Sequence, residues 1–177
     1  MTRLLFAILP AFAAMALSAQ DMTAEAIASL ESGVICPPPT VGTAPAPGTV
    51  AGTTHLIDEN PPFVSLGNRV PAVLGIGFGV KAMAVDPAGL SDVTMTVTHP
   101  PMGDGKATSQ SFFTRVGGGD PSLTFYQFDF DYELLIGTWT MTATKDGVTL
   151  YETRFDVVPP RLVPELAAIC GFEQLLS

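Results

Sequence analysis

The segment 128–133, with the sequence FDFDYE, places oxygen ligands and aromatic rings at alternate positions. Its acidic residues are Asp129, Asp131 and Glu133. On a regular strand these carboxylates would share one face, about 6.8 Å from one to the next. Calcium needs several oxygen atoms around one ion, and this spacing is too wide for that. We therefore predict no metal site, and an acidic face turned to solvent opposite a buried face of Phe128, Phe130 and Tyr132. A metal-binding protein that uses the three carboxylates is the alternative.

The two histidines, His55 and His99, are the residues on which an enzyme hypothesis would depend. A hydrolase could use His99 with nearby acids, but the chain has no G-x-S-x-G motif to present a nucleophile. Two histidines without a His-x-His pair form a zinc site only if Asp or Glu completes it. We predict that both histidines are turn or surface residues, that the protein is not an enzyme, and that it uses no cofactor.

The run LGIGFGV, residues 74–80, places Gly75, Gly77 and Gly79 two positions apart. A phosphate-binding loop needs a different glycine spacing and a helix directly after it, and no helix is expected here. On a strand these glycines would leave one face as bare backbone, on which another side chain, an aromatic one by preference, can lie. We predict packing on this face, with a shallow ligand groove as the alternative.

A series of β-strands must position these residues, with candidates at 54–58, 72–85, 92–99, 107–116, 122–133, 138–145 and 148–158. The last two flank Asp146-Gly147, a pair typical of two-residue hairpins because both central residues need a positive φ. Leu150 and Phe155 both look core-facing at an odd spacing, which predicts a bulge near Tyr151 and Glu152. Strands with regular turns and no helices between them predict an all-β fold, an immunoglobulin-like antiparallel β-sandwich of about seven strands with short terminal helices.

The predicted core takes alternate residues of facing strands, namely Ile76, Phe78, Val93, Met95, Val97, Phe128, Phe130, Trp139 and Met141. Short helices are predicted at 23–32 and 164–170. Cys36 and Cys170 lie just after the first helix and at the end of the second, so we predict one disulfide between them. In the chain-entropy model, closing such a long loop contributes about 4–5 kcal/mol to the free energy of unfolding.

The N-terminal sequence predicts export. Arg3 precedes an apolar run over 4–17 that is too short to span a bilayer, and 17–19 read Leu-Ser-Ala, so residues 1–19 are a predicted signal peptide. Its removal from 177 residues leaves 158, with seven Lys and Arg against seventeen Asp and Glu, a charge of about −10. Such an acidic chain is a poor partner for nucleic acid or anionic lipid, and we predict no membrane span in the mature chain. The predicted location is periplasmic or secreted.

The predicted organisation is a signal peptide (1–19), a short helix and Pro-rich linker (20–49), a β-sandwich domain (50–160) and a C-terminal helical tail (161–177). Three segments, VPAVLGIGFGVKA, VTMTVTHPP and GTWTMTATKDGVTLYETRFDVV, resemble an uncharacterised proteobacterial family known as a domain of unknown function. The resemblance covers about residues 50–160, implies a secreted β-rich domain, and carries over no catalytic residue. The Gly137-x-Trp139 and Phe155-x-Val157 pairs also resemble the last strands of bacterial immunoglobulin-like modules.

These observations favour an exported, non-enzymatic β-sandwich that acts as a structural or protein-binding module in the periplasm, with an unidentified protein partner. A periplasmic protein that binds a small ligand or a metal is the second hypothesis, and a hydrolase is the third. The three differ in what they place at the surface. A binding module needs an exposed apolar or edge-strand surface, whereas a ligand site or an active site needs convergent polar groups.

Overall fold

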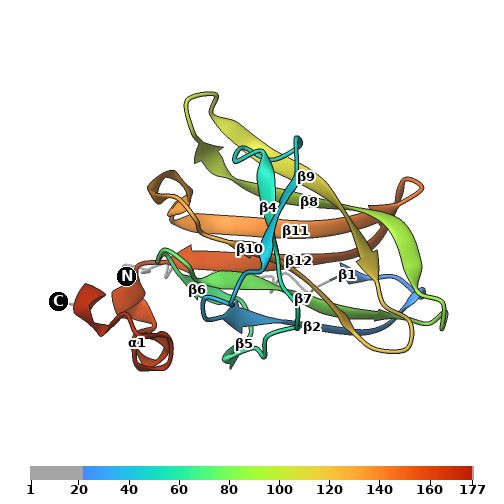
Figure 1. Cartoon of the computed structure of the whole chain (residues 1–177), viewed down its shortest axis with the longest axis horizontal. Coiled ribbons are helices and arrows are strands. Elements are labelled where there is room, and N and C mark those ends of the chain that lie inside the picture. The colour runs from blue at the N-terminus through green and yellow to red at the C-terminus, as the bar shows by residue number, and fades with distance from the viewer. Residues whose placement is uncertain (1–21, 177) are drawn as a thin grey trace, which may run out of the picture.

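Two mainly antiparallel sheets face one another in the computed structural model, which describes residues 22–176 (Figure 1). The larger sheet has the order β1-β12-β11-β8-β9, with β6 paired in parallel to β12. Its strands are β1 (Met22–Thr23), β6 (Arg69–Pro71), β8 (Leu90–Met102), β9 (Ala107–Val116), β11 (Gly137–Lys145) and β12 (Val148–Val158). The second sheet has the order β10-β7-β2-β5. Its strands are β2 (Ile27–Ile35), β5 (Ser65–Leu66), β7 (Gly77–Ala84) and β10 (Ser122–Gln127).

The core lies between the two sheets and is built mainly from the inward residues of β7, β8, β11 and β12. Trp139 and Phe78 are fully buried with their ring centroids 5.7 Å apart, in an edge-to-face arrangement. Eight of the nine predicted core residues are buried: Ile76, Phe78, Val93, Met95, Val97, Phe128, Trp139 and Met141. Phe130 was predicted wrongly, because β10 ends at Gln127 and the chain turns before Phe130 can reach the core. The all-β sandwich is thereby confirmed.

The β11–β12 hairpin confirms the turn that its sequence predicts. Asp146 and Gly147 have φ values of 50° and 78°, so both adopt the left-handed conformation that a two-residue turn requires. The register shifts where Ala143 pairs with Tyr151 and Thr144 with Thr149, so the extra residue is Leu150. The predicted bulge is therefore present, one position before the expected place, and it lets adjacent Leu150 and Tyr151 both be buried.

The glycine face of β7 is also packed as predicted. A Cβ built on Gly79 would stand 2.6 Å from the Cβ of Phe125, and one on Gly77 would stand 3.3 Å from its ring. Phe125 of β10 therefore lies on bare backbone that no larger residue could share. The strand begins at Gly77 and not at 72, however, and Leu74 is exposed.

Two N-terminal predictions were wrong. The segment predicted as a helix at 23–32 instead contributes to β1 and β2, and β2 pairs with β7 from Ile27 to Ile35. A helix of about ten residues is marginal alone, so pairing with a buried strand outweighs its local preference. The predicted linker contains β3 (Gly42–Pro45), which pairs as a two-stranded hairpin with β4 (Thr53–Leu56), close to the strand predicted at 54–58. Its turn buries Ala46.

The C-terminal end matches its prediction. The helix α1 (Pro164–Cys170) has Pro164 in its first turn and ends at Gly171, whose φ is 77°. Cys36 and Cys170 form a disulfide across 134 residues, with their Cα atoms 5.2 Å apart. Three 3₁₀ turns complete the described part: η1 (Asp131–Glu133), η2 (Pro160–Leu162) and η3 (Glu173–Leu175). The predicted signal peptide lies outside the described residues. Within 22–176, no helix is long and apolar enough to cross a membrane.

Candidate functional site

The site lies where the β3–β4 hairpin crosses β9, the edge strand of one sheet, beside β10, the edge strand of the other (Figure 1). Two hydrogen bonds fasten the hairpin to β9. The backbone N–H of Val50 donates to Oε1 of Gln110 at 2.6 Å, and the N–H of Ser111 donates to the carbonyl of Gly48 at 3.0 Å. A segment that looked like a linker therefore completes one side of the site.

A buried polar network lies beneath the hairpin and joins the two sheets. Nε2 of Gln110 lies 3.2 Å from Nε2 of His99 and 3.1 Å from Oη of Tyr126. The Tyr126 hydroxyl in turn donates to Oε1 of Glu133 at 2.6 Å. Burial, together with the neighbouring Glu133 carboxylate, raises the pKa of Tyr126 well above its usual range. The hydroxyl therefore stays protonated and remains a donor to Glu133.

Glu133 has a different environment from the one predicted for it. It is 3% exposed, and its Oε2 accepts hydrogen bonds from the backbone N–H groups of Asp129 and Phe130 at 2.6 and 3.0 Å. Burial raises the pKa of this carboxyl, although the hydrogen bonds from Tyr126 and the two amides oppose that shift. The predicted solvent-facing ladder is therefore wrong at Glu133, because the turn η1 replaces strand geometry after Gln127.

The same turn removes Phe130 and Tyr132 from the buried face predicted for them, whereas Phe128 is buried as predicted. Phe130 is 46% exposed and Tyr132 is 38% exposed, with the two rings stacked at 5.2 Å between centroids. Asp131, between them, is exposed as predicted. The three carboxylates thus do not converge, and within residues 22–176 no group of three His, Cys, Asp or Glu is placed to hold a metal ion.

His99 is a core residue and not the surface residue that was predicted. It is 6% exposed, and its ring lies 4.9 Å from that of Trp139. Nδ1 lies 2.8 Å from the carbonyl of Pro100, which can only accept, so Nδ1 carries the proton. Nε2 is then the acceptor for the amide of Gln110. His99 thus connects the polar network to the aromatic core.

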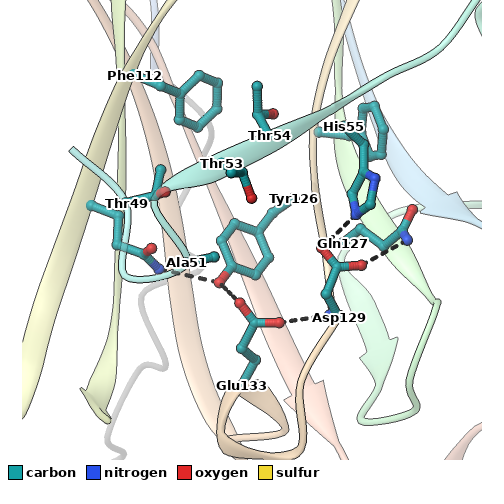
Figure 2. Close-up of a pocket in the computed structure, with 12 residues that line it drawn as sticks. Thr49, Ala51, Thr53, Thr54, His55, Phe112, Tyr126, Gln127, Asp129 and Glu133 are labelled. Atoms are coloured by element: carbon teal, nitrogen blue, oxygen red, sulfur yellow. Dashed lines mark hydrogen bonds and ion pairs between the residues drawn. The ribbon is translucent and has the colours of Figure 1, made fainter. Parts of the chain in front are cut away.

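His55 projects from β4 toward the turn that follows β10, as Figure 2 shows. Its Nε2 lies 2.8 Å from Oδ2 of Asp129, whose Oδ1 accepts a hydrogen bond from Nε2 of Gln127 at 2.9 Å. Nδ1 of His55 and Oε1 of Gln127 are buried and have no partner within the described protein. The pocket beside these residues measures about 50 Å³, which is room for a water molecule and not for a metabolite.

A larger groove of about 610 Å³ lies next to this cavity, between β4, the free edge of β9 and β10. Phe112 and Phe113 of β9 line one wall, and Leu123 and Phe125 of β10 line another. The hydroxyls of Thr114 and Thr124 are 2.9 Å apart and join the two strands. Phe113 is 82% exposed, the highest value among the large hydrophobic residues that the structure exposes. The groove is thus mainly apolar and open to solvent.

The structure brings His55, Asp129, Glu133 and His99 into one region, but separates Asp131 from them. Sequence reasoning missed Gln110 and Tyr126, which hold this region together. One signal for Gln110 was available, because it precedes Phe112, Thr114 and Val116 at alternate positions and so falls on the inward face of its strand. A polar residue at such a position needs a buried hydrogen-bond partner.

Comparisons with known proteins give a fold and a family. An immunoglobulin-like protein from Pseudomonas aeruginosa has a similar solved structure, with a TM-score of 0.50 and 18% sequence identity over 81% of this chain and all of that one. That likeness shows the fold alone. No curated protein matches the chain. The model of a family described as "Domain of unknown function (DUF3859)" matches residues 26–157, and the chain belongs to that family.

Proposed function

We propose that this chain is an exported, non-enzymatic immunoglobulin-like module that binds another protein in the periplasm. The observation that carries the proposal is the 82% exposed ring of Phe113 on the uncovered edge of β9, beside an apolar groove. An unpaired strand edge readily accepts another chain, and natural proteins commonly protect such edges with lysine, proline or a covering segment. Here the hairpin covers the edge at Ser111, and Phe113, two residues further along β9, stays exposed.

The polar network supports a binding role over a catalytic one. The polar side chains of Gln110, Tyr126 and Glu133 hydrogen-bond to one another, to His99 and to the backbone. A general base must reach a proton on the substrate, whereas Nε2 of His99 is occupied by Gln110 in a buried position. The network therefore acts to hold β9, β10 and the hairpin in place, which fixes the walls of the groove.

Exposure of a large aromatic ring favours a protein partner. Hot spots of protein interfaces are buried aromatic or arginine anchors that fit pockets on the partner. Phe113 and the exposed Arg115 stand two positions apart on the outer face of β9, and both border the groove. The disulfide and the apolar N-terminal run support export, because disulfides persist in oxidising compartments.

The proposal is tested by placing a photo-crosslinking phenylalanine analogue at position 113 in the organism that makes the protein. Val148 is the matched control, since it is 62% exposed on β12 and does not line the groove. We expect one discrete adduct from position 113, with the crosslinked peptide of the partner identified by mass spectrometry, and none from position 148. Absence of an adduct at 113, or identical adducts at both positions, would contradict a binding role for this edge.

A further inference from the structure

We propose that the groove accepts a short extended segment that pairs with the edge of β9 and carries an acidic, an apolar and an aromatic residue in sequence. The acidic residue would face Arg115, and the aromatic residue would face Phe113. This inference rests on the proposed function and names the chemistry of the partner at the same site. Its evidence comes from three separate features: the backbone groups at the edge, the faces of the side chains, and the charge of Arg115.

The backbone of β9 has pairing capacity next to the hairpin. Because the N–H of Ser111 points away from β8 to the carbonyl of Gly48, the N–H and C=O of Phe113 point to the same edge by strand alternation. Two contacts cap this edge of β9. The carbonyl of Gly48 accepts a hydrogen bond from the N–H of Ser111, and the hydroxyl of Ser122 donates to the carbonyl of Arg115 at 3.0 Å. The stretch between these two caps can pair with about three residues.

The hairpin also indicates the direction of the added segment. Along the chain, Gly48 contacts Ser111 and Val50 contacts Gln110, so the hairpin turn runs opposite to β9. An added segment that runs in the direction of the hairpin turn would be antiparallel to β9, which is the commoner pairing of strands. Read from its N-terminus, it would meet Arg115 first and Phe113 last.

Side-chain alternation then specifies three consecutive residues. Phe113 and Arg115 lie on the outer face, while Phe112 and Thr114 lie on the inner one. Residues opposite Arg115 and Phe113 would form cross-strand pairs with them on the outer face. The residue between would point inward toward Phe112, Leu123 and Phe125, which line the groove. An apolar side chain of moderate size suits that position.

The charge of Arg115 selects an acidic residue at the first position. The protein has a net charge of −9, and among the described residues no ion pair joins Arg115 to an acidic side chain. A guanidinium binds a carboxylate through two parallel hydrogen bonds, which gives direction as well as attraction. Asp120 also lines the groove and would repel a second negative charge, so one acidic residue is preferred to a run of them.

The test uses a labelled peptide, Ser-Thr-Ser-Glu-Val-Phe-Ser-Thr-Ser, and fluorescence anisotropy with the full mature protein. We expect saturable binding that Phe113→Ala weakens about tenfold, as loss of an anchor does. Arg115→Glu should weaken binding at least about tenfold, and replacing Glu by Lys in the peptide should restore it for that variant alone. A peptide with the reversed order Phe-Val-Glu should not bind, because antiparallel pairing would then place its Phe opposite Arg115 and its Glu opposite Phe113. A peptide with an N-methyl group on Phe should not bind either, because backbone pairing is lost.

No binding of the Glu-Val-Phe peptide, equal binding of the N-methylated or reversed peptide, or no rescue by the charge exchange would overturn this inference. Thermal unfolding of each variant, together with its circular dichroism spectrum, checks that the fold is intact. The outcome is separable from that of the proposed function. A partner crosslinked at position 113 through a segment of other chemistry would leave the binding role in place and refute the peptide specificity. Absence of any partner at that position would refute the binding role itself.

Discussion

The interior around Trp139 and the open edge beside Gln110 belong to the same two sheets, yet they are held together differently. The interior packs aromatic rings, with Trp139 within 5.7 Å of Phe78, Phe128 and Tyr126 between ring centroids. The edge relies on hydrogen bonds that reach from β9 to β10 and to the hairpin. Apolar packing is non-directional and stabilises the fold, whereas the hydrogen bonds of the polar network fix where β9, β10 and the hairpin lie relative to one another. We infer that the first region maintains the fold and the second shapes a binding surface.

The strongest test of the interior is Trp139→Ala. Loss of a fully buried tryptophan should lower the free energy of unfolding by about 3–5 kcal/mol, since the cavity it leaves cannot close completely. Urea denaturation measures this change. Thr140→Ala on the outer face of the same strand is the control, with an expected change of about 0.5 kcal/mol or less. A loss near zero for the tryptophan variant would show that the core is not organised around this ring.

The corresponding test of the edge is Gln110→Ala, for which we expect a smaller loss of about 1–3 kcal/mol. The variant leaves the N–H of Val50 and Nε2 of His99 without their partner. It should also free the hairpin, so limited proteolysis should cut within 42–56 before the rest of the chain. Gln127→Ala is the matched control, because that amide hydrogen-bonds to the half-exposed Asp129 and, among the described residues, makes no direct hydrogen bond to the hairpin. Equal protease resistance of both variants would contradict the role given to Gln110.

The electrostatic contribution of the edge can be isolated with Glu133→Gln. Because burial raises the pKa of Glu133, the folded state holds its proton more tightly than the unfolded state. The stability from this group is therefore complete at acid pH and is lost as pH rises through the raised pKa. We expect the free energy of unfolding of the wild type, relative to the variant, to fall as pH rises from about 4, where an unfolded glutamate loses its proton, through the raised pKa. Asp131→Asn controls for the change in net charge, and a rise with pH would contradict the sign.

Much of the interior could be predicted from the sequence because local rules decide it. Period-two alternation placed Trp139 and Met141 in the core, and the Asp146-Gly147 pair fixed the register of the last hairpin. Cys36 and Cys170 paired as the even cysteine count suggested. In each of these cases a few neighbouring residues, or a single choice of partner, were sufficient.

The edge could not be predicted in the same way because its contacts are distant in the chain. Val50 and Gln110 are 60 residues apart, and His55 and Asp129 are 74 apart. Regular alternation in 128–133 suggested a strand, but three hydrogen bonds to the buried Glu133 stabilise a turn instead. A side chain that satisfies backbone N–H groups overrides strand preference, and the pattern of residue types alone does not show this.

Amide hydrogen exchange of the protein, with and without the Glu-Val-Phe peptide, tests most directly whether β9 offers a binding edge. In the free protein we expect the amide of Phe113 to exchange rapidly, that of Ser111 to exchange through local opening of the hairpin, and that of Met141 only through global unfolding. The peptide should strongly slow the exchange of the Phe113 amide. Exchange of the Met141 amide should slow only by the amount that corresponds to the overall gain in stability from peptide binding. A Phe113 amide already as slow as that of Met141 in the free protein, or one unaffected by saturating peptide, would contradict the account.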